Sequence, residues 1–477
     1  MTEHPTASER FTAFITGLTP EEIPDEVRHR ARIHILDTLG AGIAGAASRE
    51  ADISRAALGT AYGIPGQGTG VSLWGAPGQL PPLGAAFVNG VAAHAFELDD
   101  SGGCDHSGAV VLPAALASVA LRAGEAGTCE ETVPVDGARF LRAVVSGYEI
   151  ARRVQDALGG YDSVNNAGWH STGVCGTFGA AVAAGVVLGL DAEQLASAIG
   201  LAGSFTGGTW SFIGDGAMSK RMHVGRAAEA GLNSALLARA GFTGPKDLFS
   251  APWGSFLRLY GQPGDIDETA LYETLGREWQ IEKASIKPHA TCRSTHSAID
   301  AILDLRSSHA ITAESVQSVT VHTSSLIADM CGNADVGSLI STQLSMQFSL
   351  AAALVHGQVG LDQIALHSRT NPQILDLMER IHLEVDPQQQ GGAAEPRLSV
   401  RTDSDTIEIQ AVRAKGASTN RLSDKETINK FTALASTRLT HDAASAIASL
   451  VLDLDDAADI SPLLGLLAAE SEPVLLC

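Results

Sequence analysis

The chain has 477 residues, of which 45% are hydrophobic and 18% are charged, so it is long enough to bury a large core and form two domains. Its 54 acidic residues outnumber its 32 lysines and arginines, and the net charge of −22 argues against binding to nucleic acid or to an anionic membrane surface. With 50 glycines and only 5% aromatic residues, the composition predicts a mainly helical protein whose helices pack through small side chains.

Hydrophobic periodicity predicts a succession of helices up to about Gly261. In the first, Thr19 can cap the helix, Pro20 opens it, and an apolar stripe runs from Val27 to Leu39. Further helices are predicted at 83–96, 108–122, 137–155, 172–189, 192–203 and 223–241.

The pattern changes after about residue 276, where short alternating runs indicate strands. Strands are predicted at 315–323, 380–386, 397–403 and 406–412, with helices at 341–357 and 361–367 and a surface loop at 388–396. The tail returns to helical patterns. The sequence therefore predicts a mainly α fold, with a large helical domain (1–275 and 414–477) and a smaller inserted α+β domain (276–413).

Residues 173–190 carry no charge and are long enough to raise the question of a membrane span. Their alanines and glycines make them only weakly lipophilic, no second span of that length is evident, and basic flanks are missing, so a buried core helix is expected. The polar amino terminus indicates no secretory signal. Six cysteines without CxxC spacing suggest neither a disulfide framework nor a zinc ribbon, and we expect a cytoplasmic protein.

Two segments gather cations and contain no Asp or Glu, which is unusual in so acidic a chain. They are residues 216–228, with Lys220, Arg221, His223 and Arg226, and residues 283–299, with Lys283, Lys287, His289, Arg293 and His296. Such segments suit an anionic small molecule, because Lys and Arg bind carboxylates through charge-assisted hydrogen bonds. Ser294 or Thr295 can also cap the helix that follows. The alternative is a pair of solvated faces that contact neighbouring acids.

The stretch HAFELDDSGGCDHS, residues 94–107, crowds acids and histidines into a glycine-broken turn. Its candidate zinc ligands are His94, Asp99, Asp100 and His106. No HExxH motif supports a zinc site, so no metal is expected. Helix capping by one of the aspartates is another interpretation. The remaining one is acid–base catalysis, in which carboxylates and imidazoles exchange protons beside a substrate carboxylate.

His170 precedes the predicted helix at 172–189. The dipole at a helix amino terminus favours a neutral imidazole there, which suits a proton acceptor, although a lone histidine is more often structural.

Several of these segments, in order, resemble the MmgE/PrpD family, which includes 2-methylcitrate dehydratase and cis-aconitate decarboxylase. They are FVNGVAAHAFELDD, HSGAVVLPAALA, GWHSTGVCGTFGAAVAAGVVLGL, SKRMHVGRAAEAGLNSALLARAGFTGP and KPHATCRSTHSAIDAI. The resemblance implies a homodimer, each chain having a helical domain and an α+β lid domain. It also implies lyase or epimerase chemistry on small di- and tricarboxylates without a metal or organic cofactor.

The resemblance matches His106, His170, Lys220 and His223 to family site residues. Glu97 falls where the decarboxylases have an aspartate, and Ser101 where they have a threonine. Cys292 falls on a decarboxylase histidine, and Met330 lies near a decarboxylase tyrosine. These last two departures count against decarboxylation of cis-aconitate.

The sequence thus predicts a cofactor-independent lyase for a small di- or tricarboxylate, most like a 2-methylcitrate dehydratase. The alternatives are a cis-aconitate decarboxylase, a dicarboxylate epimerase, a non-catalytic carboxylate-binding protein and, last, a metallohydrolase. The predicted catalytic residues are His106, His170, Lys220, Glu97 and Asp99. The predicted substrate-binding residues are Asp100, Ser101, His223, Cys292, Arg293 and His296.

Overall fold

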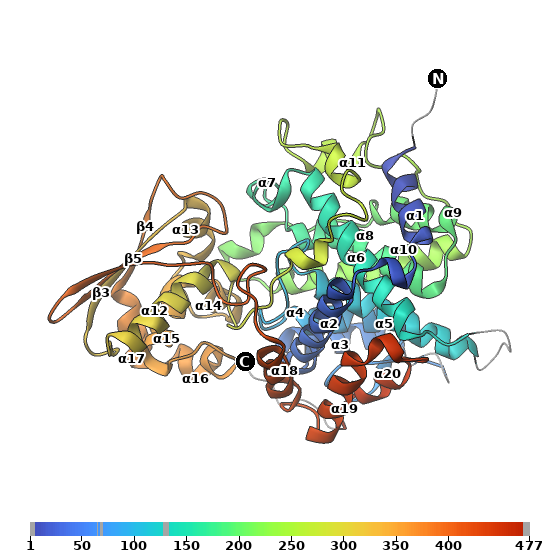
Figure 1. Cartoon of the computed structure of the whole chain (residues 1–477). Helices are drawn as coiled ribbons and strands as arrows, with labels where there is room; N and C mark the ends of the chain where they lie inside the picture. The colour runs from blue at the N-terminus through green and yellow to red at the C-terminus, as the bar shows by residue number, and fades with distance from the viewer. Residues whose placement is uncertain (1–4, 64, 67–69, 127–132, 471–477) are drawn as a thin grey trace.

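The computed structural model of the protein describes residues 5–63, 65–66, 70–126 and 133–470. A large helical body occupies one side of the molecule, and a four-stranded sheet with its helices occupies the other (Figure 1). The mainly helical fold predicted from the sequence is confirmed. The first helices are α1 (Ala7–Gly17), α2 (Asp25–Gly45), α3 (Arg49–Tyr62), α4 (Pro82–His94), α5 (Ser107–Ala126), α6 (Gly137–Ala157), α7 (Gly160–Asn166), α8 (Ser171–Leu188), α9 (Ala192–Ala202), α10 (Ser219–Arg239) and α11 (Phe256–Tyr260).

Small residues let the central helices of the body touch. A Cβ atom added to Gly179 of α8 would lie 2.6 Å from the carbonyl oxygen of Gly147 in α6, and one added to Gly231 of α10 would lie 2.3 Å from the Cβ of Ala180. Larger side chains would push these helices apart, which explains the glycine and alanine content. Every residue of α8 is buried, so the prediction of a core helix is confirmed.

Two helices, Ser107–Glu125 and Ser171–Leu188, are long and apolar enough to span a membrane. The sequence analysis predicted a helix at 108–122 but did not recognise that it is also long and apolar enough to be a candidate span. They are 72% and 100% buried inside the protein, as core helices are, so their length and composition are weak evidence for a membrane span.

The sheet has the order β4-β3-β5-β6. Its strands are β3 (Val316–Thr323), β4 (Ile381–Val385), β5 (Arg397–Thr402) and β6 (Thr406–Gln410), and a separate short pair is β1 (Val71–Ser72) with β2 (Gln79–Leu80). β3 pairs with β4 in parallel and with β5 antiparallel. The helices of this part are α12 (His296–Ser308), α13 (Ser325–Cys331), α14 (Leu339–Gln343), α15 (Met346–His356), α16 (Leu366–Arg369) and α17 (Pro372–Glu379).

Among the described residues, the two larger hydrophobic clusters correspond to these two parts, beside a small third cluster of Ile33, Ile286 and Leu422. One core is built mostly from the body, and the other mostly from residues between Ala290 and Ala411. The tail helices α18 (Asp424–Ala435), α19 (His441–Leu452) and α20 (Pro462–Leu466) contribute to the first core, for example through Phe431. The domain bounds at 275 and 413 stay a prediction.

Several helix bounds differ from those predicted. Thr19 and Pro20 start only a short 3-10 turn, Pro20–Glu22, and α2 begins at Asp25. The helix predicted at 341–357 is broken, because Ser345 accepts a hydrogen bond from the Phe348 amide and starts α15. The helix predicted at 361–367 is a 3-10 turn (Asp362–Ile364) followed by α16. The sequence analysis missed helices α1, α3, α7, α11, α13, α17 and α20.

Four cysteines, Cys104, Cys175, Cys292 and Cys331, are free and buried. Cys129 and Cys477 lie outside the described residues.

Candidate active site

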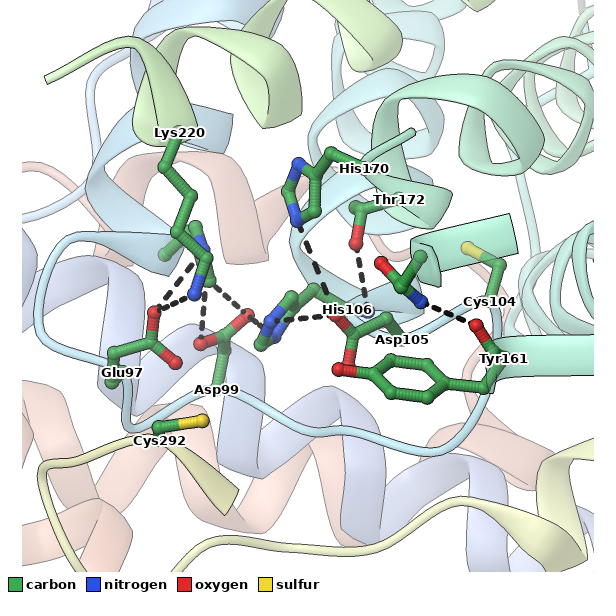
Figure 2. A network of polar contacts seen from close by, with 12 residues as sticks. Glu97, Asp99, Cys104, Asp105, His106, Tyr161, His170, Thr172, Lys220 and Cys292 are labelled. Atoms are coloured by element: carbon green, nitrogen blue, oxygen red, sulfur yellow. Dashed lines mark hydrogen bonds and ion pairs between the residues drawn. The ribbon is translucent and has the colours of Figure 1, made fainter. Parts of the chain in front are cut away.

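Six of the predicted site residues lie close together in the structure (Figure 2): Glu97, Asp99, His106, His170, Lys220 and Cys292. α4 ends at His94, and the loop that follows leads into α5. His170 is the N-cap of α8, as predicted. α4 and α10 touch closely, since a Cβ added to Gly90 would lie 3.0 Å from the Cα of Gly225. This contact brings the first turns of α10 beside the loop after α4.

A buried carboxylate, Glu97, lies among three cations. Lys220 Nζ contacts its Oε1, Arg221 Nη1 lies 2.7 Å from the same oxygen, and Lys287 Nζ lies 2.6 Å from Oε2. Burial alone would raise the pKa of Glu97, but Lys220 and Lys287 hold the pKa well below its ordinary value. One negative charge thus faces three positive charges.

A second carboxylate, Asp99, bridges two imidazoles. Its Oδ2 lies 3.1 Å from Nδ1 of His94 and 3.0 Å from Nδ1 of His106. The two rings lie 4.0 Å apart. Burial alone would raise the pKa of Asp99. The two histidines lower it by more than burial raises it, so the pKa lies well below its ordinary value. Asp99 therefore fixes the orientation of both rings.

Asp105 carries the chain of contacts onward. Its Oδ2 lies 3.3 Å from Nε2 of His106 and 4.0 Å from Nε2 of His170 (Figure 2). Burial would lower the pKa of His106, but Asp105 and Asp99 raise it above its ordinary value. Burial and the charge of Lys220 hold the pKa of His170 well below its ordinary value. His106 is thus favoured in the charged form and His170 in the neutral form.

His223 lies behind His170. Its Nδ1 is 3.3 Å from Nδ1 of His170, and burial with the charge of Lys220 lowers the pKa of His223 to about 4. Both rings also pack edge-on against Phe212. These contacts support a neutral imidazole pair.

A cavity of about 520 Å³ opens beside these groups. The predicted residues that line it are Glu97, Ser101, His106, Lys220, Cys292 and Arg293. Asp99, His170 and His223 lie behind that lining. Within the described part of the chain, the Arg293 guanidinium has no ion pair or side-chain hydrogen bond and lies largely buried at the cavity, which leaves it available to an anion.

Asp100 and His296, like His223, are not among the residues that line the cavity, and their substrate-binding role stays a prediction. Asp100 accepts hydrogen bonds from the Tyr148 hydroxyl at 2.5 Å and the Gly108 amide at 3.0 Å, which tie the loop to the helices. His296 contacts the Thr291 carbonyl oxygen at 3.2 Å and packs against His289. Both are buried in packing contacts.

The predicted cap of the helix after this segment was wrong. Thr295 is the N-cap residue of α12 but makes no side-chain cap hydrogen bond. Ser294 instead donates to the carbonyl oxygen of Gly392 in the loop at 388–396, which lines the cavity from the other side.

The prediction did not assign four residues of the site. Lys287 and His94 were noted only as part of a cation-rich run and as a possible zinc ligand. Asp105 was seen in the loop without a role, and Tyr161, which lines the cavity, had no sequence signal. The cation-rich pattern around Lys287 was the clearest available signal.

Two groups of three, His94–Asp99–His106 and Asp105–His106–His170, have ligand atoms close enough to hold a metal ion. The contacts of Asp99 with the two imidazoles account equally well for the spacing of the first group. The absence of a metal stays a prediction.

The fold and the site define a mainly helical protein with a buried acid–base cluster beside a cation-rich cavity. The chain belongs to the MmgE/PrpD family: residues 9–269 match its N-terminal domain and residues 289–456 match its C-terminal domain. This confirms the resemblance drawn from the sequence motifs.

The chain is similar to curated proteins along nearly its whole length. It is 31% identical to the cis-aconitate decarboxylase-like protein oryM of Aspergillus oryzae, with 96% of each chain covered. It is 28% identical to cis-aconitate decarboxylase of Aspergillus terreus, covering 95% of this chain and 94% of that protein. It is 27% identical to human cis-aconitate decarboxylase, covering 98% and 95%.

Proposed function

We propose that the protein is a lyase acting on a small di- or tricarboxylate without a metal or organic cofactor, and that its reaction is a dehydration like that of 2-methylcitrate dehydratase. The observation that carries the proposal is the excess of positive charge around Glu97, in a cavity that His106 also faces. A substrate carboxylate there gains charge-assisted hydrogen bonds from groups already desolvated.

Dehydration next to a carboxylate removes a proton from carbon and gives one to the leaving oxygen. His106 is the donor in this proposal, because it lines the cavity and is favoured in its charged form. His170 lies behind Asp105 and is favoured in the neutral form. In this proposal His170 is the group that accepts the proton. Lys220, Lys287 and Arg293 hold the carboxylates.

Decarboxylation is the second candidate, and it is favoured by the names of the relatives. The family departures count against it, since Cys292 and Met330 stand where the decarboxylases are expected to carry histidine and tyrosine. Cys292 lines the cavity, and its Sγ lies 3.7 Å from Met330 Sδ, so both departures lie together at the site. Neither Cys292 nor Met330 carries the imidazole or the phenol of the decarboxylase pattern.

A substrate panel tests the proposal. The protein is incubated with 2-methylcitrate, citrate, cis-aconitate and related dicarboxylates, and products are identified by mass spectrometry. A rise in absorbance from a new conjugated double bond is the expected result, whereas released CO₂ identifies the decarboxylase. Binding of these acids without turnover would replace the lyase by a carboxylate-binding protein. Turnover that requires stoichiometric zinc would revive a metallohydrolase.

A further inference from the structure

Asp105 holds an unusual backbone conformation at the edge of the cavity. Its φ is +83°, in the left-handed region that residues other than glycine, asparagine and aspartate rarely adopt. Holding such a residue there costs on the order of 1 kcal/mol, and strain of this kind gathers at functional sites. The conformation directs the carboxylate toward His106 and His170 (Figure 2).

The two nitrogens of His106 contact two different carboxylates. Nδ1 lies 3.0 Å from Asp99, and Nε2 lies 3.3 Å from Asp105. A neutral imidazole donates at only one nitrogen, whereas a charged imidazole donates at both. The charged form therefore satisfies both contacts.

His170 lacks a matching arrangement. Its Nδ1 faces the imidazole of His223, and its Nε2 is buried without a hydrogen-bond partner in the described ranges. Asp105 Oδ2 lies 4.0 Å from that nitrogen, which is 0.7 Å farther than its distance from Nε2 of His106. The same oxygen thus favours a proton on one histidine more than on the other.

We propose that Asp105 is a positioning residue whose carboxylate holds His106 in the charged, proton-donating form, and that it thereby gives the two histidines opposite roles. The proposal deepens the proposed function and rests on it for the chemistry that His106 performs. The charge state of His106 can nevertheless be measured without any substrate.

Other groups also face His106, and the test must separate them from Asp105. They are Asp99 from the same loop, His94 at the end of α4, His170 at the start of α8 and Lys287 from the segment before α12. Burial and the charge of Lys287 oppose a charge on His106, whereas Asp99 favours it. His94 and His170 both have pKa values well below the ordinary value because of burial, so these two rings are neutral. Removal of Asp105 therefore leaves the carboxylate of Asp99 against burial and the charge of Lys287.

The experiment is a pH titration of the full-length protein labelled with ¹³C at histidine Cε1, followed by NMR, with His106→Gln used to assign the resonance. Asp105→Asn keeps the size of the side chain, removes its charge and tolerates the left-handed backbone. We expect the midpoint of the His106 titration to fall by about one pH unit or more in this variant. Asp105→Gly, which accepts the same φ, should give the same shift if the asparagine variant fails to fold.

Asp162 provides the matched control. It also lines the cavity, but its Oδ1 accepts from the Gly392 amide at 3.1 Å. Asp162→Asn should leave the His106 titration unchanged. For a substrate that is turned over, the basic limb of kcat/KM should move to lower pH in Asp105→Asn, because charged His106 is lost at lower pH.

An unchanged His106 midpoint in both Asp105 variants would overturn the proposal, even if the protein dehydrates a polycarboxylate. The opposite combination, a shifted midpoint without turnover of any acid in the panel, would overturn the proposed function and leave the role of Asp105 intact.

Discussion

Two buried clusters lie side by side in this protein and use carboxylates in opposite ways. Around Glu97 the partners are the ammonium groups of Lys220 and Lys287 and the guanidinium of Arg221. Around Asp99 and Asp105 the partners are imidazoles, of which His106 has a raised pKa and His94 and His170 have lowered ones, so that charged and neutral rings lie side by side. The first cluster therefore supplies a fixed charge that can hold an anion, and the second supplies protons that can be exchanged.

The largest expected effect on activity comes from a substitution in the imidazole cluster, which consists of His94, His106 and His170 with Asp99 and Asp105. His106→Gln keeps a polar side chain but removes the exchangeable proton, so kcat should fall about 10²–10⁴-fold while KM changes little. The measurement is steady-state kinetics on whichever acid of the panel is turned over. His322→Gln on β3, outside the cavity lining, is the control and should keep its activity. A near-normal kcat for His106→Gln would remove the proton exchange assigned to this cluster.

Glu97 with Lys220, Arg221 and Lys287 forms what we call the lysine cluster, and removing the charge of Glu97 should affect stability more than any other substitution in the cavity lining. Glu97→Gln leaves three buried cations without their carboxylate, and loss of one partner of a buried ion pair costs about 3–5 kcal/mol. Urea unfolding measures the loss, and Glu395→Gln, at a partly exposed ion pair with Arg413, is the control. A loss below about 1 kcal/mol would show that water or an anion already compensates these cations.

The same carboxylate predicts a pH dependence of stability. The pKa of Glu97 is depressed in the folded protein, so its contribution is present above the ordinary value of 4.5 and is lost as the pH falls toward the folded value. The free energy of unfolding should therefore fall more steeply below about pH 4.5 in the parent protein than in Glu97→Gln. Parallel curves for the two proteins would contradict the depressed pKa.

A smaller effect is expected from removing one positive charge. Lys287→Met keeps the apolar stem and loses the ammonium, so a carboxylate loses one charge-assisted hydrogen bond and KM should rise about 10–100-fold. Lys283→Met is a close control, because Lys283 also lines the cavity but is partly exposed and pairs with Glu278 at 3.2 Å. Equal KM values for the two variants would show that Lys287 contributes no more to substrate binding than the partly exposed Lys283.

The sequence predicted much of the fold because helix signals are local. The small-residue helix α8 and the start of that helix at His170 follow from the composition and spacing of neighbouring residues. The break between α14 and α15 was missed, since Ser345 caps a helix inside a run with continuous apolar character. Capping there depends on a side-chain rotamer that periodicity does not register.

The site was predicted by residue type but not by pairing. Glu97 and Lys287 are 190 positions apart in the chain, and only the fold places them 2.6 Å from each other. Asp100 and Asp99 are adjacent and chemically identical, yet one contacts the Tyr148 hydroxyl and the other contacts His94 and His106. Backbone direction in the loop decides this difference, and no motif records it.

The smallest expected effect uses Cys292 as a probe beside the lysine cluster. A hydrogen bond from Cys331 lowers the pKa of the Cys292 thiol to about 6; burial opposes this effect, and Lys220 adds to it. Alkylation of Cys292 by iodoacetamide should accelerate about tenfold between pH 5 and pH 7, as the thiolate forms. Peptide mass spectrometry follows the reaction site by site.

Cys104 serves as the internal control in the same sample, because burial raises the pKa of its thiol to about 12 and it should remain unmodified. If Lys220 contributes to the field at Cys292, Lys220→Met should move the alkylation profile to higher pH, whereas His106→Gln should move it less. If the alkylation profile is the same in Lys220→Met, the charge of Lys220 does not affect the pKa of the Cys292 thiol. The lowered pKa would then come from the hydrogen bond with Cys331.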